Sequence, residues 1–234
     1  MSTPTDHAAA SNAPVQSVWG GAYGTVTIGA VALIFLAAMQ SLAVTTVMPI
    51  VSDELNGAAL YAVAFSGTLA TSVIGMVAAG AWSDRSSPLK PLTAAVVLFV
   101  IGLVIAGMAA TMPTLVIGRL IHGLGVGGQT VSLYAVVARV YPAALHGRVF
   151  AAFSAAWVVP SLIGPFLAGA VTEYLHWRWV FFGIAGLTVV AFVMVYTRLA
   201  GRDLHTDEPA GGGTAARLGL AVAVALGALT LSLA

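Results

Sequence analysis

The sequence contains no cysteine, and this absence excludes several kinds of protein at once. Without thiols the chain cannot form disulfide bonds, a thiolate metal site or a cysteine nucleophile. Charge is also scarce, since only 7% of the 234 residues are Asp, Glu, Lys or Arg. A soluble domain carries about 25% charged residues, so this composition excludes an ordinary cytosolic domain, a disordered chain and a nucleic-acid-binding protein. The net charge of +1 gives no long-range attraction for a polyanion.

Apolar residues make up 59% of the chain and are grouped in long runs. A helix needs about 20 mostly apolar residues to cross the hydrocarbon core of a membrane. Turns such as Asn56-Gly57 and Met112-Pro113 separate the runs, which are too long for alternating strands. Because backbone groups in lipid must be paired internally, we expect membrane-spanning helices. The six expected spans are Thr27–Ile50, Leu60–Ser83, Pro91–Met112, Leu115–Val140, Val149–Thr172 and Trp179–Leu199.

Three further segments flank the expected bundle, which covers residues 26–199. Residues 1–25 contain no Lys or Arg, so we expect a disordered tail and no secretory signal. Residues 200–215 include three consecutive glycines and predict a flexible linker. Residues 216–234 predict part of a seventh span. We therefore expect a fragment of a longer protein; the alternative is pairing with itself or with a partner.

Lys and Arg are unevenly distributed between the two ends of the expected helices. The connections after spans one, three and five contain one base, Arg178, whereas the other bases except Arg119 lie in or directly beside the connections after spans two, four and six. The positive-inside rule then predicts that these even connections and the tail are cytoplasmic. The preference for Arg over Lys suggests a bacterial source, and hence the inner membrane. The bases in or directly beside the even connections are Arg85, Lys90, Arg139, Arg148, Arg198, Arg202 and Arg217.

The segment Gly80–Lys90 combines an acid with two bases at the end of the second span. Asp84, Arg85 and Lys90 can bind a neighbouring helix end through charge and hydrogen bonds. Contacts that form in one conformation and break in another act as a gate. The alternative is ordinary positive-inside topology with an aspartate that favours a turn.

Arg119 is a charged residue far from the basic end of its expected span, and His122 follows one helical turn later. A charge at membrane depth is costly, so Arg119 is expected to face a cavity or a partner, unless it snorkels to the surface. His122 titrates in the physiological range when unperturbed, although a packing role is the alternative. Gly123 and Gly127 are four residues apart and predict close packing of a neighbouring helix.

The fifth span contains two prolines and several small residues. Each proline removes a backbone donor, so Pro160 and Pro165 predict a bent helix, while Gly164 and Gly169 allow close packing. The alternative is a kinked helix without a special role. A further group of polar and aromatic residues would be able to line a cavity, although core packing is equally compatible with Trp157. These cavity candidates are Gln40, Thr45, Gln129 and Trp157, while Trp177 and Trp179 are typical of an interfacial belt.

Taken together, these segments resemble the major facilitator superfamily, and within it the fourteen-span drug:proton antiporters. The resemblance is carried by Gly80–Lys90, Arg119–Gly127, Pro160–Gly169 and His176–Phe181. It implies a six-helix N-terminal bundle made of two inverted three-helix repeats, plus the start of helix seven. It also implies that Gly80, Asp84, Arg85 and Lys90 form a gate, that Arg119 takes part in proton coupling, and that Gly164-Pro165 favours export.

The first span departs from this resemblance at one position. Val44–Pro49 is similar to the helix-one signature, in which an acid stands at the position of Gln40. An amide cannot take up or release a proton in this range. No Asp or Glu lies deep in any span, so we hypothesise that His122 contributes to proton coupling in this half.

The sequence therefore predicts an all-α polytopic membrane protein that exports small drug-like or amphipathic molecules by proton antiport and alternating access. An uptake carrier or symporter, and a transport-inactive fragment, are the alternatives. We expect a lipid bilayer, a small-molecule substrate, protons and a second six-helix bundle as partners, and no nucleic acid. No catalytic triad, phosphate-binding loop or metal-ligand cluster is present in the sequence, so we expect neither an enzyme nor a cofactor or metal.

Overall fold

The computed structural model describes residues 17–21, 23–202, 204 and 214–233, and this part of the chain is helical without a strand. Six helices are long and apolar enough to cross a membrane, which confirms the all-α polytopic class. Most of the expected tail and linker, residues 1–16 and 205–213, lie outside the described residues. The elements are α1 (Gly24–Glu54), η2 (Ala58–Leu60), α2 (Tyr61–Ser83), α3 (Leu89–Gly107), α4 (Met112–Val140), α5 (Ala143–Tyr174), α6 (Arg178–Leu199) and α7 (Thr214–Leu233).

Several helices extend beyond the apolar runs that predict them. Hydropathy marks only the part of a helix that lies in hydrocarbon, and hydrogen bonding continues past it. Helix α4 begins with Pro113 in its first turn, where a missing N–H costs little, and Thr111 Oγ1 accepts from Thr114 N at 3.5 Å. Helix α5 begins directly after Pro142, six residues before the expected start at Val149.

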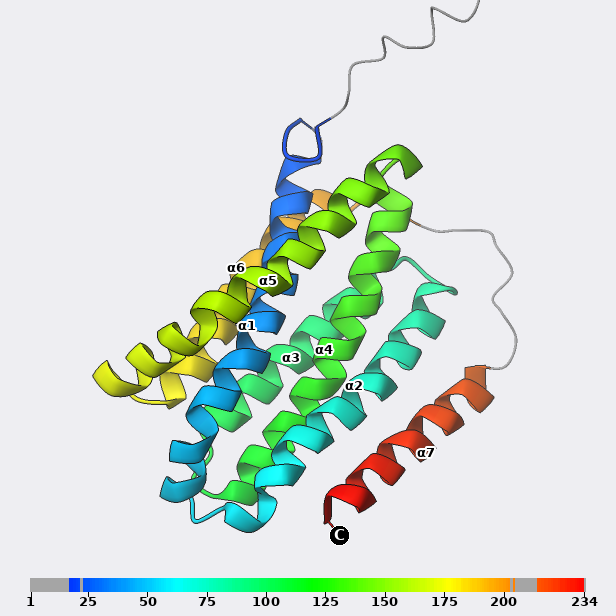
Figure 1. Ribbon diagram of the computed structural model, residues 1–234. Helices are drawn as coiled ribbons and strands as arrows, with labels where there is room; N and C mark the ends of the chain where they lie inside the picture. The colour runs from blue at the N-terminus through cyan, green and yellow to red at the C-terminus, as the bar shows by residue number, and fades with distance from the viewer. Residues whose placement is uncertain (1–16, 22, 203, 205–213, 234) are drawn as a thin grey trace, which may run out of the picture.

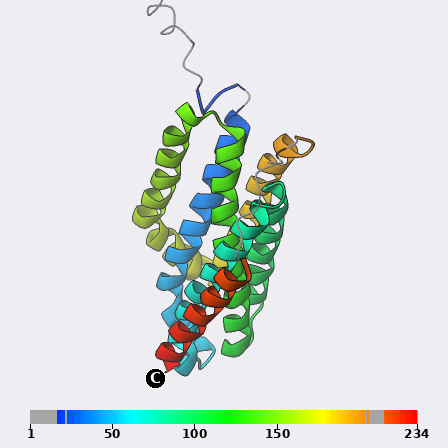
Figure 2. The same ribbon diagram turned by 90° about the vertical axis from the view of Figure 1, so that its right-hand side faces the viewer.

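The six spanning helices pack in two groups of three. Helix α1 packs mainly against α5 and α6, while α4 packs mainly against α2 and α3. Contacts between α3 and α6 join the groups, and α7 lies along α2 (Figures 1 and 2). The expected repeats are α1–α3 and α4–α6, so each group combines helices from both.

Helix α4 approaches its neighbours as closely as two backbones can. A Cβ added to Gly123 or Gly127 would collide with the backbone oxygens of Thr68 or Ser72 on α2. A Cβ at Gly118 would lie 2.6 Å from the backbone nitrogen of Ala106 on α3. The close approach predicted at Gly123 and Gly127 is therefore present, and it is made to α2.

The connections alternate between two ends of the bundle. The start of α1, the α2–α3 and α4–α5 turns and the end of α6 lie at one end, which we call the basic end (Figure 1). The α1–α2, α3–α4 and α5–α6 turns lie at the opposite end. The helices thus bring the basic connections together, as the charge distribution requires.

Candidate functional site: a buried basic pair and the contacts at both ends of the bundle

Arg119 and His122 lie side by side inside the bundle. Only 4% of Arg119 and 1% of His122 is exposed, so Arg119 is not snorkelling to the surface. Its Nη1 donates to His122 Nδ1 at 3.4 Å, and its Nε donates to the carbonyl of Ala64 on α2 at 3.4 Å. Because arginine can only donate, His122 Nδ1 accepts, and the imidazole proton lies on Nε2. That Nε2 is buried and has no hydrogen-bond partner among the described residues.

No carboxylate neutralises Arg119 in the part of the chain that the structure describes. Among the described residues Glu54 forms an ion pair with Arg178, and its carboxylate also lies 3.8 Å from His176 Nε2. Asp53, Asp84 and Glu173 occur at helix ends, and the remaining acids occur in the tail and linker sequences. On α3, the Phe99 ring packs against the His122 ring with centroids 4.6 Å apart. Arg119 is thus a buried cation among apolar and neutral groups.

A side-chain hydrogen bond crosses the boundary between α1 and α4, which we call the α1–α4 seam. Gln129 Nε2 donates to the Leu33 carbonyl at 3.0 Å and fixes the register of the two antiparallel helices. Gln40 lies two turns further along α1 than Leu33, and His122 lies two turns before Gln129 on α4, so they share one depth. Gln40 is fully buried, and neither amide atom has a partner among the described residues. The buried Ser132 hydroxyl also has none there.

Two of the cavity candidates do not join this seam. Thr45 is exposed, and its hydroxyl donates to the Leu42 carbonyl at 2.7 Å. Trp157 is 45% exposed on α5. The structure therefore places Gln129 in the α1–α4 seam and buries Gln40 at the depth of His122, whereas Thr45 and Trp157 are exposed.

The predicted gate residues lie at the basic end of the bundle. Asp84, Arg85 and Lys90 are exposed, and Gly80 packs against α4, with an added Cβ 3.6 Å from Val131. In the described residues Asp84 forms no ion pair.

Arg139, which the sequence used only for topology, holds this end of the bundle together. Its Nη2 donates to the Ser83 carbonyl at 2.6 Å, and its Nη1 donates to the carbonyls of Ser86 and Leu204 at 2.9 and 2.8 Å. A cation is favourable beside the free carbonyls at the end of a helix. The sequence feature that indicates this role is a single arginine in the last turn of an otherwise apolar helix.

Tyr141 links the end of α4 to the start of α1. The Thr27 hydroxyl donates to the Val18 carbonyl at 2.6 Å, so the Tyr141 phenol, 2.8 Å away, donates to Thr27. Burial raises the pKa of Tyr141, and the phenol therefore keeps its proton at physiological pH.

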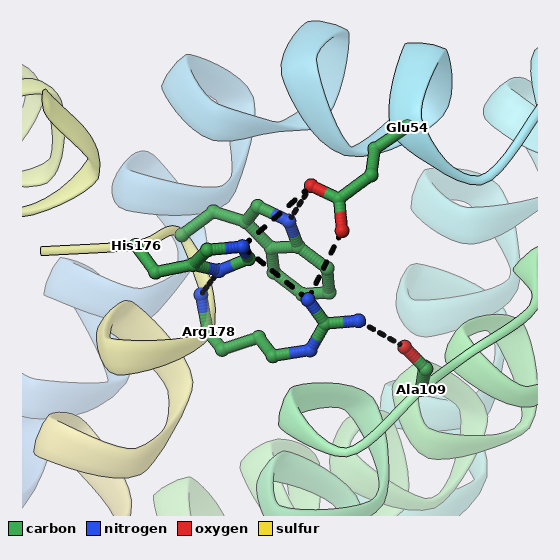
Figure 3. A network of polar contacts seen from close by, with 5 residues as sticks. Glu54, Ala109, His176 and Arg178 are labelled. Carbon is green, nitrogen blue, oxygen red and sulfur yellow. Dashed lines mark hydrogen bonds and ion pairs between the residues drawn. The ribbon is translucent and has the colours of Figure 1, made fainter.

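A network of polar contacts joins three connections at the opposite end (Figure 3). Glu54 accepts from Trp177 Nε1 at 2.7 Å and from Arg178 Nη1 at 3.0 Å. Arg178 Nη2 donates to the Ala109 carbonyl at 2.9 Å, and the guanidinium lies 4.3 Å from the Trp177 ring centre. His176 Nε2 lies 3.8 Å from Glu54. We call these five residues the outer network; it ties α1 and α6 to the α3–α4 turn.

The outer network corrects one sequence interpretation. Trp177 is 1% exposed and donates to Glu54, so its assignment to an interfacial belt is wrong. Trp179 is 56% exposed, as a belt residue would be.

The proline-glycine segment of α5 divides between two surroundings. Pro160 and Gly164 are buried, and a Cβ on Gly164 would lie 3.4 Å from Met39 Sδ on α1. Pro165 is exposed, and nothing lies within 4 Å of a Cβ added to Gly169. One face of the segment, with Pro160, Gly164 and Ala168, is therefore buried, and Gly164 and Ala168 lie toward α1, whereas Pro165 is exposed.

Comparison with known proteins decides the family. The model of the Major Facilitator Superfamily matches residues 30–233, which include most of α1 and all of α2 to α6. The chain belongs to the major facilitator superfamily. This is a family of membrane transporters and not of enzymes, in agreement with the expectation from the sequence.

Relatives within the superfamily occur in bacteria and fungi. An uncharacterized transporter of Mycobacterium tuberculosis is 34% identical over 163 residues, which are 68% of this chain and 24% of the relative. The multidrug efflux pump SdrM of Staphylococcus aureus is 25% identical over 169 residues, which are 72% of this chain and 38% of the pump. The chain thus spans 24% and 38% of the length of these two major facilitator relatives.

Solved structures of the superfamily share the fold. The xylose transporter XylE from E. coli, in a partially occluded inward-open conformation, matches with a TM-score of 0.61 and 17% identity, covering 89% of this chain and 57% of XylE. A peptide transporter in complex with sulfate matches with a TM-score of 0.66 and 16% identity, covering 91% of this chain and 46% of that one. The six-helix arrangement is therefore that of one half of a major facilitator protein.

Proposed function

We propose that the protein is a secondary transporter of the bacterial inner membrane that exports small drug-like or amphipathic molecules in exchange for protons. The proposal depends on one observation above all, the buried Arg119–His122 pair inside a major facilitator bundle. The similarity to a multidrug efflux pump supports the substrate class and the direction. Substrate would bind between this bundle and a second six-helix bundle, and rocking of the two would expose it to either side.

His122 is the proposed proton-binding group of this half. It contacts Arg119 through Nδ1, so a proton that arrives at Nδ1 must displace that contact. Gln40, at the same depth, cannot change its charge. Protonation would therefore create a second cation beside Arg119 and separate the two side chains by repulsion, which couples proton binding to movement of α4.

Asp84, Arg85 and Lys90 are the proposed gate at the basic end, with Gly80 packing that end of α2 on α4. Asp84, Arg85 and Lys90 are exposed on this half. A second bundle that approached this end would bring its helix termini to them, and the contacts would form only in the conformation closed at this end. On α5, the contact of Pro160 and Gly164 with α1 would seal a leak path and favour export.

Transport of a cationic dye tests the proposal. In inside-out vesicles that contain the full chain, a proton gradient should drive dye accumulation, and Arg119→Ala should reduce it at least tenfold. Arg148→Ala, which removes an exposed arginine near the start of α5, serves as the control and should leave accumulation intact. Dye uptake into intact cells, driven by the same gradient, would instead identify a symporter and refute export.

The pH dependence of transport tests the role of His122. In His122→Gln the amide can still accept from Arg119, yet it cannot bind a proton. We expect transport by this variant to lose its dependence on pH between about 5 and 8. A profile identical to that of the unchanged protein would exclude His122 as a coupling group.

A further inference from the structure

We propose that a monovalent anionic group binds beside Arg119, in the α1–α4 seam. The group is either an inorganic anion or the carboxylate of a transported molecule. The second case deepens the proposed function and rests on it, whereas the first does not need it.

The charge of Arg119 is the first argument. Guanidinium has five N–H donors, and the contacts that Arg119 makes in the described residues are two neutral acceptors, both at 3.4 Å. A cation inside a membrane bundle is costly unless an opposite charge accompanies it. The acids of this chain lie at helix ends, in the tail and in the linker, and Glu54 is already paired with Arg178. A bound anion would supply the missing charge.

Unused donors at the same depth are the second argument. The Nε2–H of His122 has no acceptor among the described residues, and the amide of Gln40 has neither donor nor acceptor partner there. Both side chains are at least nine-tenths buried. Leaving such groups unpaired is unfavourable. Because His122 Nδ1 faces the guanidinium, its Nε2–H points away from Arg119, so an anion held by Arg119 would accept from the Gln40 amide once the seam widens.

The packing of α4 indicates how the anion enters. Toward α2 and α3, glycines bring α4 into backbone contact and leave no path. Toward α1, by contrast, side chains make the contacts. Gln129 donates to the Leu33 carbonyl, and Tyr141, directly after α4, donates to Thr27. In the present conformation the Gln40 amide is fully covered, so the seam must widen before an anion reaches it. Anion binding would therefore favour the conformation with the wider seam.

Thermal unfolding of the full chain in detergent tests the proposal, with intrinsic tryptophan fluorescence as the readout. In gluconate buffer, chloride, formate and benzoate are titrated separately. A group that binds the folded state raises its unfolding temperature, and we expect a rise of several degrees at saturation. Arg119→Gln should abolish the rise. Gln40→Glu should also abolish it, because an internal carboxylate would then occupy the site, while Arg148→Gln should retain it.

The three anions separate the two sources. A rise with chloride that both Arg119→Gln and Gln40→Glu abolish identifies an inorganic anion site. A rise with formate or benzoate alone, lost in the same variants, identifies a site for a carboxylate. No rise with any of the three, or a rise of equal size in Gln40→Glu, overturns the proposal. If Arg119→Gln does not fold, Gln40→Glu decides the matter alone.

Failure of this inference is distinct from failure of the proposed function. Gradient-driven dye export without any effect of anions on unfolding would refute the anion site only. An anion-dependent rise in unfolding temperature without dye export would refute the proposed function only.

Discussion

Glu54 is held by two donors of different kinds, a neutral indole and a guanidinium. The indole of Trp177 is buried, whereas the carboxylate it binds remains partly exposed, with 40% of the Glu54 side chain accessible. Water can therefore replace some of what the carboxylate loses when a donor is removed. At the scale of single residues, each polar contact of the outer network therefore contributes only a small amount to the free energy of unfolding. This contribution depends more on the geometry of the contact than on its charge.

Replacing Trp177 by Phe tests this estimate. The variant keeps an aromatic ring and removes the N–H that Glu54 accepts, so we expect a loss of about 1 kcal/mol of stability. The unfolding temperature in detergent should fall by roughly 2–4 °C. Trp179→Phe is the matched control, because Trp179 is exposed and its indole N–H makes no hydrogen bond in the described residues. Equal shifts for the two variants would show that the bond to Glu54 contributes nothing.

At the scale of elements, the contact between α2 and α4 depends on the absence of side chains. A methyl group on Gly127 would meet the backbone of Ser72, which cannot move without shifting a whole helix. Because the membrane offers little hydrophobic drive between helices, close backbone packing is a main source of their association.

Gly127→Ala should therefore separate α2 from α4 and destabilise the bundle by about 1–3 kcal/mol, as overpacking does elsewhere. Gly186→Ala on α6 is the control, since nothing lies within 4 Å of the added methyl group. There the change should be neutral, or stabilising by up to about 1 kcal/mol through helix propensity. Denaturant titration in detergent measures both, and a Gly127→Ala variant as stable as the control would refute the packing argument.

The sequence predicted where the spanning helices lie along the chain better than it predicted which face of each helix is buried. The runs that predict six spans are confirmed, and the Gly123–Gly127 spacing correctly indicated a close neighbour. It did not separate buried Gln40 from exposed Thr45, both on α1. A membrane helix is apolar on its lipid face and on its core face alike, so the periodicity of apolar residues does not indicate the direction in which the core face points. The partners of Arg139 and Trp177 depend on that direction, which is why the sequence missed them.

At the scale of the whole molecule, the alternation of connections leads to a prediction about sidedness. The chain has no cysteine, so single cysteines can be introduced without any background. Ala144, in the first turn of α5 at the basic end, and Tyr174, at the opposite end of the same helix, are both exposed. A membrane-impermeant thiol reagent should label Tyr174→Cys in intact cells, and Ala144→Cys only in inside-out vesicles. Labelling of Ala144→Cys in intact cells would reverse the orientation and the proposed direction of export.

The grouping of α1 with α5 and α6 has a consequence for biosynthesis. The ribosome delivers α1 first, yet the helices that cover most of it emerge last. Helices α2, α3 and α4, by contrast, find their partners within one another as soon as α4 is made. During translation α1 therefore remains without most of its partners, in contact with the insertion machinery or with lipid, while α2, α3 and α4 pack together. We expect the nascent chain to be most susceptible to degradation by quality-control proteases after α4 has been synthesised and before α6 has been synthesised.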